Sequence, residues 1–232
     1  MLLVGIKSCW RDRDAGFHNA IRGTWGNALR QRGVLVRFFL GHDGNPIDKH
    51  PKSRSEALQS DEITIDSADD YHSLPFKTRA ICHWTYPKNV DHIFLCDTDT
   101  YVKADKLLAC GYQRYDYVGK ISKPIGVSFP YVAVGRNGVM EPIDNCYPWA
   151  SGGFGYFLSR NAFGLVADSY PTSWAEDLWV GQLLAKGLAK EEFTALDLPA
   201  GSYSMHFPSA QYNSGYDLKF GWMDQMHKEH GK

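Results

Sequence analysis

The chain has 232 residues, of which 44% are hydrophobic and 14% aromatic, and its net charge at pH 7 is −1. This length provides for one large domain or two small ones, and the hydrophobic content excludes a disordered protein. The nearly balanced charge, without a basic or acidic tail, gives no support for electrostatic capture of nucleic acid.

The first half of the chain alternates apolar runs with helical patterns. Four segments are predicted strands: LLVGIKSC (2–9), VLVRFFLG (34–41), the short EITID (62–66) and HIFLCD (92–97). LLVGIKSC and HIFLCD are apolar runs without alternation, which predicts buried strands. Between them, HNAIRGTWGNALRQRG (18–33) and SLPFKTRAICHWTYP (73–87) have the apolar spacing of helices. The polar segment 43–60 is predicted to start as a loop and to end as a short helix. This alternation predicts an α/β sheet covered by helices on both faces.

The second half of the chain is less regular. YDYVGKI (115–121) and GGFGYFLSR (152–160) are predicted strands, and RNAFGLVAD (160–168) and WAEDLWVGQLLAKG (174–187) are predicted helices. The segment 123–148 contains several Gly and Pro residues and is predicted to be irregular. No linker or internal repeat is visible, so we predict a single domain over residues 1–232.

The cysteines and the N-terminus bear on the cellular compartment. The five cysteines are an odd number without CxxC spacing, which argues against a disulfide framework or a zinc site and favours buried free thiols. No apolar run reaches the ~20 residues of a membrane span. We therefore expect a cytoplasmic protein if the chain is complete, and the lumen of the Golgi or ER if an anchor has been removed.

Two carboxylates, Asp97 and Asp99, follow directly on a predicted buried strand. Ligands of open α/β sheets bind at the carboxyl ends of strands, and unpaired carboxylates there are costly to desolvate. A Mg²⁺ or Mn²⁺ ion would offset that cost, because such ions take one or two protein carboxylates and fill their coordination sphere with water and substrate phosphates. The alternative is that the two side chains cap a turn through local hydrogen bonds.

The D-x-D tripeptide by itself is a weak signal, because a chain of this length should contain roughly one by chance. A second one, at 12–14, is predicted to be a solvated surface loop.

Three further places carry chemically useful groups. Glu176 and Asp177 begin a predicted helix, where the helix dipole favours negative charge and where one of them can instead serve as a general base at the edge of a pocket. Gly152 and Gly153 indicate either a tight turn or a close approach of backbone to a ligand. His206 lies among aromatic residues, and a lone histidine is more often structural than a metal ligand.

Six segments in order resemble one known family. They are AIRGTWG (20–26), FFLG (38–41), DDYHSLPFKTRAICHW (69–84), FLCDTDTYV (94–102), YPWASGGFGYFLSR (147–160) and EDLWVGQLL (176–184). Together they resemble the β-1,3-glycosyltransferases of glycosyltransferase family 31, which include β-1,3-galactosyltransferases and Fringe. The resemblance runs from about residue 3 to about residue 207.

The resemblance implies a fold and an activity. The fold is GT-A, an α/β architecture in which helices flank a mixed central sheet, with a nucleotide-binding half over about residues 1–105 and an acceptor-binding half over about residues 106–232. The implied activity is that of an inverting hexosyltransferase, which moves a sugar from a UDP-sugar to a hydroxyl of a glycan or glycoconjugate, with Mn²⁺ or Mg²⁺, and forms a β-1,3 bond. The alternatives are a metal-dependent nucleotidyltransferase or nucleotide-sugar hydrolase, and an inactive sugar-binding module.

The resemblance also assigns roles to the acidic residues and to the histidine. Asp99 matches the carboxylate that binds the metal directly, and Asp97 matches the one close to the ribose and to the water shell of the metal. His206 lies where Fringe-like enzymes supply a histidine ligand. Asp177 matches the acidic residue proposed as catalytic base, with Glu176 beside it. The family usually has three consecutive acidic residues where this chain has Asp-Thr-Asp.

The remaining assignments concern the two substrates. Arg22 and Lys77 match basic family positions near the donor, and Gly152 and Gly153 match the glycine turn beside the transferred sugar. Trp149 is a candidate for stacking on the acceptor sugar, with packing as an equal alternative.

Overall fold

The structure is a computed structural model that describes residues 1–42, 57–122, 132–134, 140–142, 147–188, 193–208 and 216–231. A mixed seven-stranded sheet lies at the centre of these residues, in the order β12-β6-β11-β4-β1-β2-β3. Its strands are β1 (Leu2–Lys7), β2 (Leu35–His42), β3 (Glu62–Ala68), β4 (His92–Asp97), β6 (Tyr117–Gly119), β11 (Tyr156–Ser159) and β12 (Ala195–Asp197). The predicted class, a mixed central sheet flanked by helices, is confirmed.

Strands β1, β2, β3 and β4 are mutually parallel, and β1 lies between β2 and β4. Strand β11 then runs antiparallel between β4 and β6, and β12 is parallel to β6. The sheet therefore takes strands from both halves of the chain. Strands β1 and β4 are almost wholly buried, which explains why their sequences read as continuous apolar runs.

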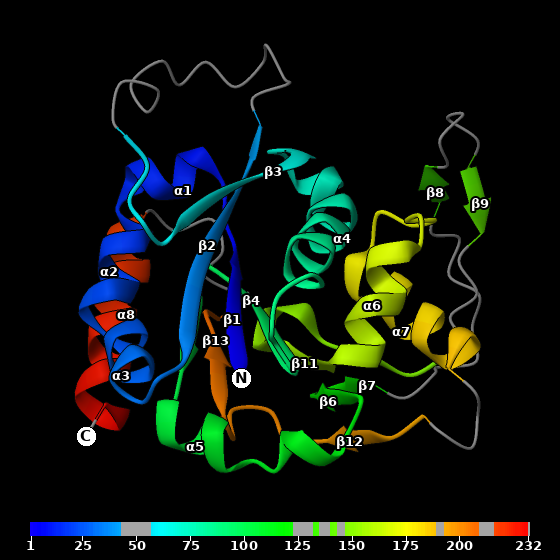
Figure 1. Ribbon diagram of the computed structural model, residues 1–232. Coiled ribbons are helices and arrows are strands. Elements are labelled where there is room, and N and C mark those ends of the chain that lie inside the picture. Colours follow the sequence, from blue (N-terminus) through cyan, green and yellow to red (C-terminus); the bar gives the residue numbers. More distant parts are fainter. Residues whose placement is uncertain are drawn as a thin grey trace.

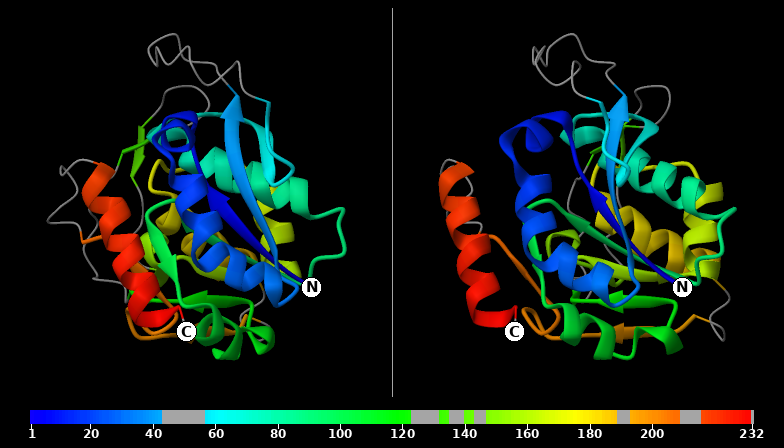
Figure 2. Two further views of the ribbon diagram at one scale, coloured as in Figure 1. Left: turned by 90° about the vertical axis from the view of Figure 1, so that its left-hand side faces the viewer. Right: turned by 60° about the vertical axis from the view of Figure 1, so that its left-hand side comes forward.

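Helices cover both faces of the sheet (Figure 1). They are α1 (Trp10–Ala15), α2 (Phe17–Gly23), α3 (Trp25–Gln31), α4 (Leu74–Thr85), α5 (Ala104–Ala109), α6 (Arg160–Asp168), α7 (Glu176–Gly187) and α8 (Tyr216–His230). Helices α2, α3 and α8 contribute to one hydrophobic core, and α4, α6 and α7 contribute to the other. Figure 2 shows α8, in red, alongside α2, in blue.

Short elements complete the fold. The small two-stranded sheets pair β5 (Thr100–Val102) with β13 (Ser204–His206), β7 (Ile121–Ser122) with β10 (Trp149–Ala150), and β8 (Val132–Val134) with β9 (Met140–Pro142). The 3-10 turns are η2 (Tyr71–Ser73), η3 (Tyr112–Arg114) and η4 (Gly152–Phe154).

Several predicted elements have different bounds in the structure. The helix predicted over 18–33 is two helices, α2 and α3, because Thr24 leaves the helical conformation (φ −120°, ψ −120°). The strand predicted over 152–160 begins as the turn η4 and becomes β11 only at Tyr156. The strand predicted over 115–121 is interrupted between β6 and β7. Of the segment 43–60, residues 57–60 are not helical and the rest lies outside the described residues.

Two predictions about sequence features can be compared with the structure. The described cysteines, Cys9, Cys82, Cys96 and Cys110, are free thiols, and Cys82 and Cys96 are buried; Cys146 lies outside the described residues. No helix within the described ranges is long and apolar enough to cross a membrane. The segment 12–14, predicted to be a solvated loop, instead lies in α1, and this prediction is wrong for Arg13, whose side chain is buried against Glu62.

Candidate active site at the strand ends

The site begins with two charged residues that end adjacent parallel strands. Lys7 of β1 and Asp97 of β4 are register partners, and Lys7 Nζ lies 3.3 Å from Asp97 Oδ1. Lys7 is buried, whereas about a third of the Asp97 side chain is exposed (30%). Burial opposes the charge of Lys7, but the carboxylates of Asp97 and Glu176 raise its pKa. Lys7 therefore stays protonated beneath the acidic doublet.

Glu176 is bound by three side chains from three other elements. Its Oε2 atom lies 3.2 Å from Lys7 Nζ. Its Oε1 atom accepts hydrogen bonds from the Thr78 hydroxyl of α4 (2.7 Å) and from the Tyr156 hydroxyl of β11. The residue is only 6% exposed. Glu176 thus joins β1, α4, β11 and α7 at one buried point, which is a structural role.

Asp177, the next residue on α7, has a different environment. It is half-buried, and its Oδ2 atom accepts a hydrogen bond from the backbone N–H of Gly152 (3.2 Å). Its Oδ1 atom accepts one from the N–H of Leu178 (2.9 Å). Burial and the neighbouring charge of Glu176 raise the pKa of Asp177 to about 6. A carboxylate with a pKa near neutrality is well suited to accept a proton from a hydroxyl.

Asp99 lies in the turn between β4 and β5 and is nearly buried (6% exposed). The pairing of β13 with β5 aligns His206 with Thr100, which brings His206 Nε2 to 3.5 Å from Asp99 Oδ1. Lys219 of α8 reaches the other oxygen, with Nζ 3.2 Å from Oδ2. Burial favours the protonated acid, but His206 and Lys219 together lower the pKa of Asp99. The same carboxylate raises the pKa of His206 against the effect of burial.

Each carboxylate of the doublet therefore has its own lysine. From the sequence, a divalent ion was expected to offset their desolvation cost, whereas the structure provides the ammonium groups of Lys7 and Lys219. Burial and the charge of Asp99 nevertheless raise the pKa of Asp97, even though Lys7 lowers it. Lys7 therefore does not fully offset the effects of burial and of Asp99 on the charged form of Asp97.

The two glycines lie where a side chain would crowd the residues of the site, most severely at Gly153. A Cβ atom on Gly153 would come within 2.9 Å of the His206 ring, which is closer than real Cβ contacts. A Cβ atom on Gly152 would lie 3.3 Å from Glu176 Oε2 and 3.8 Å from Asp177 Oδ2. The turn η4 can therefore pass between the histidine and the α7 carboxylates because it has no side chains there.

The donor set fits a hard divalent ion in part. Asp99 Oδ1 is buried and makes no hydrogen bond with suitable geometry to any residue that the structure describes, so one oxygen of a charged group lacks a full partner there. His206 Nε2 lies beside this oxygen and would be the nitrogen ligand of such an ion, and Asp97 lies two residues away along the chain. Among the described residues, no group of three or more His, Cys, Asp or Glu is arranged to hold a metal. An ion at Asp99 would need ligands from water or substrate, as Mg²⁺ and Mn²⁺ commonly do.

Arg22 and Lys77, which were predicted to bind the sugar donor, both form ion pairs with carboxylates of the protein. Arg22 donates two hydrogen bonds to Asp61 and one to Glu62. Lys77 is buried and donates to the Ser8 carbonyl and to Asp69 Oδ1 (2.7 Å). Neither makes a described ion pair with Asp97 or Asp99, so their roles at the donor stay predictions.

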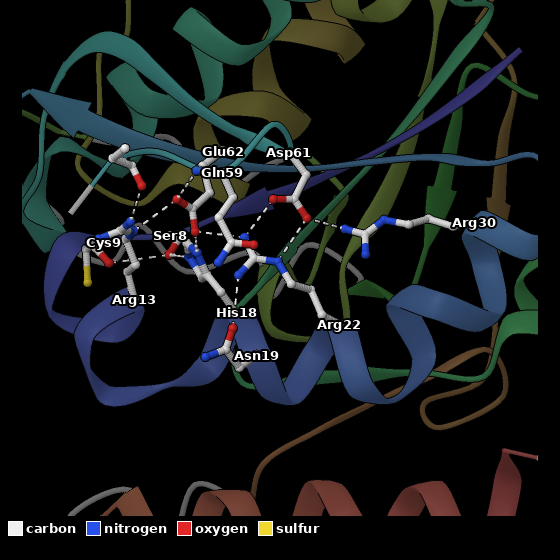
Figure 3. Close-up of polar contacts among 11 residues, drawn as sticks. Ser8, Cys9, Arg13, His18, Asn19, Arg22, Arg30, Gln59, Asp61 and Glu62 are labelled. Atoms are coloured by element: carbon white, nitrogen blue, oxygen red, sulfur yellow. Dashed lines mark hydrogen bonds and ion pairs between the residues drawn. The ribbon is translucent and has the colours of Figure 1, made fainter.

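Arg22 belongs to a polar network between α1, α2 and the start of β3 (Figure 3). At its centre, Glu62 accepts from Arg13 (3.0 Å) and Arg22 (2.8 Å) and lies 2.7 Å from His18 Nδ1. The other ring nitrogen of His18 lies 2.7 Å from the Ser8 hydroxyl. Because Glu62 is acidic, we assign the proton of neutral His18 to Nδ1, so that Ser8 donates to Nε2. This network fixes the backbone that follows Lys7.

Trp149, the predicted acceptor-stacking residue, packs in β10 against α7. A Cβ atom on Gly181 would lie 2.7 Å from the Trp149 Cβ, so close packing here requires glycine. The indole Nε1 is buried, and no acceptor lies within hydrogen-bonding distance in the part of the chain that the structure describes. Packing against α7 is evident, and the contact with an acceptor sugar stays a prediction.

Four residues of this site were not predicted from the sequence: Lys7, Thr78, Tyr156 and Lys219. Lys7 could have been found, because a lysine that ends an otherwise apolar strand lies at the same sheet edge as Asp97. Tyr156 and Lys219 gave no such signal, since their positions depend on the antiparallel insertion of β11 and on the docking of α8.

A family model described as Galactosyltransferase matches residues 18–191. A probable beta-1,3-galactosyltransferase 13 of Arabidopsis thaliana is 34% identical over 114 residues, which cover 45% of this chain and 30% of that relative. Beta-1,3-galactosyltransferase 4 of Rattus norvegicus is 31% identical over 113 residues, which cover 47% of this chain and 30% of that relative. The matched part thus spans under a third of either relative.

Among solved structures, an inositol-1-phosphate CTP transferase from T. maritima has a TM-score of 0.48 at 12% identity. The superposition covers 97% of this chain and 96% of that one. A glycosyltransferase involved in the glycosylation of the major capsid of PBCV-1 has a TM-score of 0.47 at 9% identity, with coverages of 96% and 99%. Likeness at this level says nothing about activity.

Proposed function

The chain belongs to the galactosyltransferase family, and on that premise we propose that it is an inverting hexosyltransferase that moves a sugar from a UDP-sugar to a glycan hydroxyl, forming a β-1,3 bond. The names of the two curated relatives support galactose as the transferred sugar and the β-1,3 position as the linkage. The acceptor belongs to the class of glycans or glycoconjugates.

One observation carries this proposal: Asp177 is a half-buried carboxylate with a pKa of about 6 at the glycine turn. We assign it the role of general base. Its carboxylate takes the proton of the acceptor hydroxyl while the hydroxyl oxygen attacks the anomeric carbon. The bond to the UDP oxygen breaks on the opposite face, so the anomeric configuration inverts in a single displacement.

Glu176 supports the role of Asp177 as general base without contacting the substrate itself. It is held by Lys7, Thr78 and Tyr156, so it cannot turn toward a substrate without leaving three partners. Its fixed negative charge helps to raise the pKa of Asp177. Of these two adjacent carboxylates, Asp177 is thus proposed to act as the base, and Glu176 to raise the pKa of Asp177.

For the donor, Asp99 and His206 would hold Mn²⁺ or Mg²⁺, with Asp97 close to the ribose. When bound, the ion supplies Lewis-acid stabilisation of the negative charge on the departing UDP. Asp97 and Lys7 would then orient the nucleotide at the strand ends, and the turn with Gly152 and Gly153 would lie beside the transferred sugar. Trp149, whose buried indole N–H has no hydrogen-bond partner among the described residues, is proposed to contact the acceptor.

Product analysis tests the proposal. The protein is incubated with UDP-galactose and other UDP-sugars, Mn²⁺ and a set of β-linked galactoside and glucosaminide acceptors. Release of UDP with a β-glycoside as the second product supports the proposal, and the linkage follows from NMR. Release of UMP or pyrophosphate would instead identify a nucleotide-sugar hydrolase or a nucleotidyltransferase, and no turnover with any donor would favour a binding module.

A further inference from the structure

Lys219 reaches the acidic doublet from a helix outside the segment that the family model matches. Helix α8 is anchored by Met223 and Met226, which are buried in the core that it shares with α2. Phe220 packs on Phe17 of α2, with ring centroids 4.8 Å apart. The helix is therefore fixed on the sheet side, and its first turns present Lys219 at the ends of β4 and β5.

The position of the Lys219 ammonium is well defined by its surroundings. Its side chain is only 14% exposed, and Nζ lies 3.2 Å from Asp99 Oδ2. The same ammonium lies 5.9 Å from the ring centroid of Phe17 and 5.5 Å from that of Phe207, within the range of cation–π attraction. The Lys219 ammonium thus already lies on one carboxylate oxygen of Asp99, the residue that is proposed to bind the metal directly.

We propose that Lys219 is an internal cation that competes with the divalent ion for the Asp99 carboxylate. This inference rests on the metal role of Asp99 in the proposed function. A divalent ion and an ammonium group on one carboxylate repel each other strongly in a partly buried site. Binding of the ion therefore requires the Lys219 side chain to leave Oδ2, while His206 lies next to the other oxygen, Oδ1.

The helix itself does not have to move for this exchange. Lysine has a long flexible stem, and the anchors Met223 and Met226 lie one and two turns further along α8. The ammonium can swing toward solvent or toward the phosphates of a bound nucleotide. Lys219 would thus keep Asp99 charge-balanced in the empty enzyme and lower its affinity for the free ion.

The test measures Mn²⁺ binding to the full chain without any nucleotide, from the EPR signal of free aqueous Mn²⁺. Lys219→Met removes the ammonium and keeps the stem, and Lys228→Met removes the same charge from an exposed position on the same helix. We expect Lys219→Met to tighten the Kd for Mn²⁺ roughly tenfold or more, and Lys228→Met to change it less than about twofold. Asp99→Asn in the Lys219→Met background should abolish the binding and so locate the ion.

The remaining outcomes are decisive as well. Equal affinity in the two lysine variants, or weaker binding in Lys219→Met, overturns the competition and leaves the metal role intact. Absence of Mn²⁺ binding in the unaltered protein and in every variant overturns both. If thermal unfolding shows that Lys219→Met does not fold, Lys219→Gln keeps a hydrogen-bond donor to Asp99 without the charge and should tighten binding in the same direction.

Discussion

Lys7 and Asp97 face each other across adjacent parallel strands, with Nζ and Oδ1 3.3 Å apart, and the same ammonium holds Glu176. Lys7 is thus a positive charge shared by the partly exposed carboxylate of Asp97 and the buried carboxylate of Glu176. We expect Lys7→Met to lower the free energy of unfolding by about 3–5 kcal/mol, because it leaves Glu176 charged and buried without its ionic partner. Urea unfolding measures this difference.

Lys106→Met is the matched control for this substitution, because Lys106 is exposed on α5. Its effect should stay within about 0.5 kcal/mol. A Lys7→Met protein as stable as the control would show that Glu176 is satisfied by Thr78 and Tyr156 alone.

Asp177→Asn should remove the proposed base while leaving the fold intact. We expect kcat to fall at least about 100-fold, since general bases contribute factors of this order, with donor affinity unchanged. UDP release and calorimetric titration with the UDP-sugar measure the two quantities. Glu176→Gln is the comparison: it should lower the unfolding midpoint clearly, whereas Asp177→Asn should not. Unchanged turnover in Asp177→Asn would reassign the base.

The pH dependence of activity follows from the pKa of Asp177, which is raised to about 6. A general base must be deprotonated, so activity should be low below this pKa and should rise with pH through it. We expect kcat/KM to reach half its plateau near pH 6 on the acidic side. A limb that lies below pH 4 would indicate that a carboxylate of ordinary pKa, and not Asp177, controls the reaction.

Asp99→Asn tests the metal role. The amide removes the negative charge that both Lys219 and a divalent ion require, so Mn²⁺ binding and metal-dependent UDP binding should be lost. Circular dichroism and thermal unfolding should show a folded protein. A variant that keeps Mn²⁺-dependent turnover at the level of the unaltered protein would remove Asp99 from the metal site.

Acid stability should depend on Glu62. Burial would raise its pKa, but hydrogen bonds from His18, Arg22 and Arg13 lower the pKa of Glu62 to about 2, below its usual 4.5. Its contribution to stability is therefore complete above pH 4.5 and is lost as the pH falls toward 2. Glu62→Gln should flatten the pH dependence of the unfolding midpoint in that window, whereas exposed Glu229→Gln should leave it unchanged.

The elements that are specified by short stretches of sequence were predicted well. The buried strands β1, β2 and β4 and the helices α4, α6 and α7 follow from apolar runs and apolar periodicity, which local sequence carries. The position of Asp97 and Asp99 at a strand end follows from the same pattern. The break at Thr24 was missed, because the apolar spacing continues across it and the change of direction comes from packing on the sheet.

Pairings between distant segments could not be predicted from local patterns. His206 meets Asp99 because β13 pairs with β5, and Tyr156 meets Glu176 because β11 enters the sheet antiparallel. The resemblance to a family identified Asp99 and His206 as partners, whereas neither local patterns nor resemblance indicated Lys219. The segment 123–148 lies largely outside the described residues, so its predicted irregularity stays a prediction beyond β8 and β9.

The antiparallel strand β11 also has a consequence for biosynthesis. When β4 leaves the ribosome, its neighbour β1 has already been made, but its other edge has no partner until the chain has been made as far as Ser159. Until then an apolar strand edge is open to pairing with other nascent chains. Slow translation between β4 and β11 would prolong this exposure, so the yield of native protein in cells should respond to codon choice and chaperone supply over that interval.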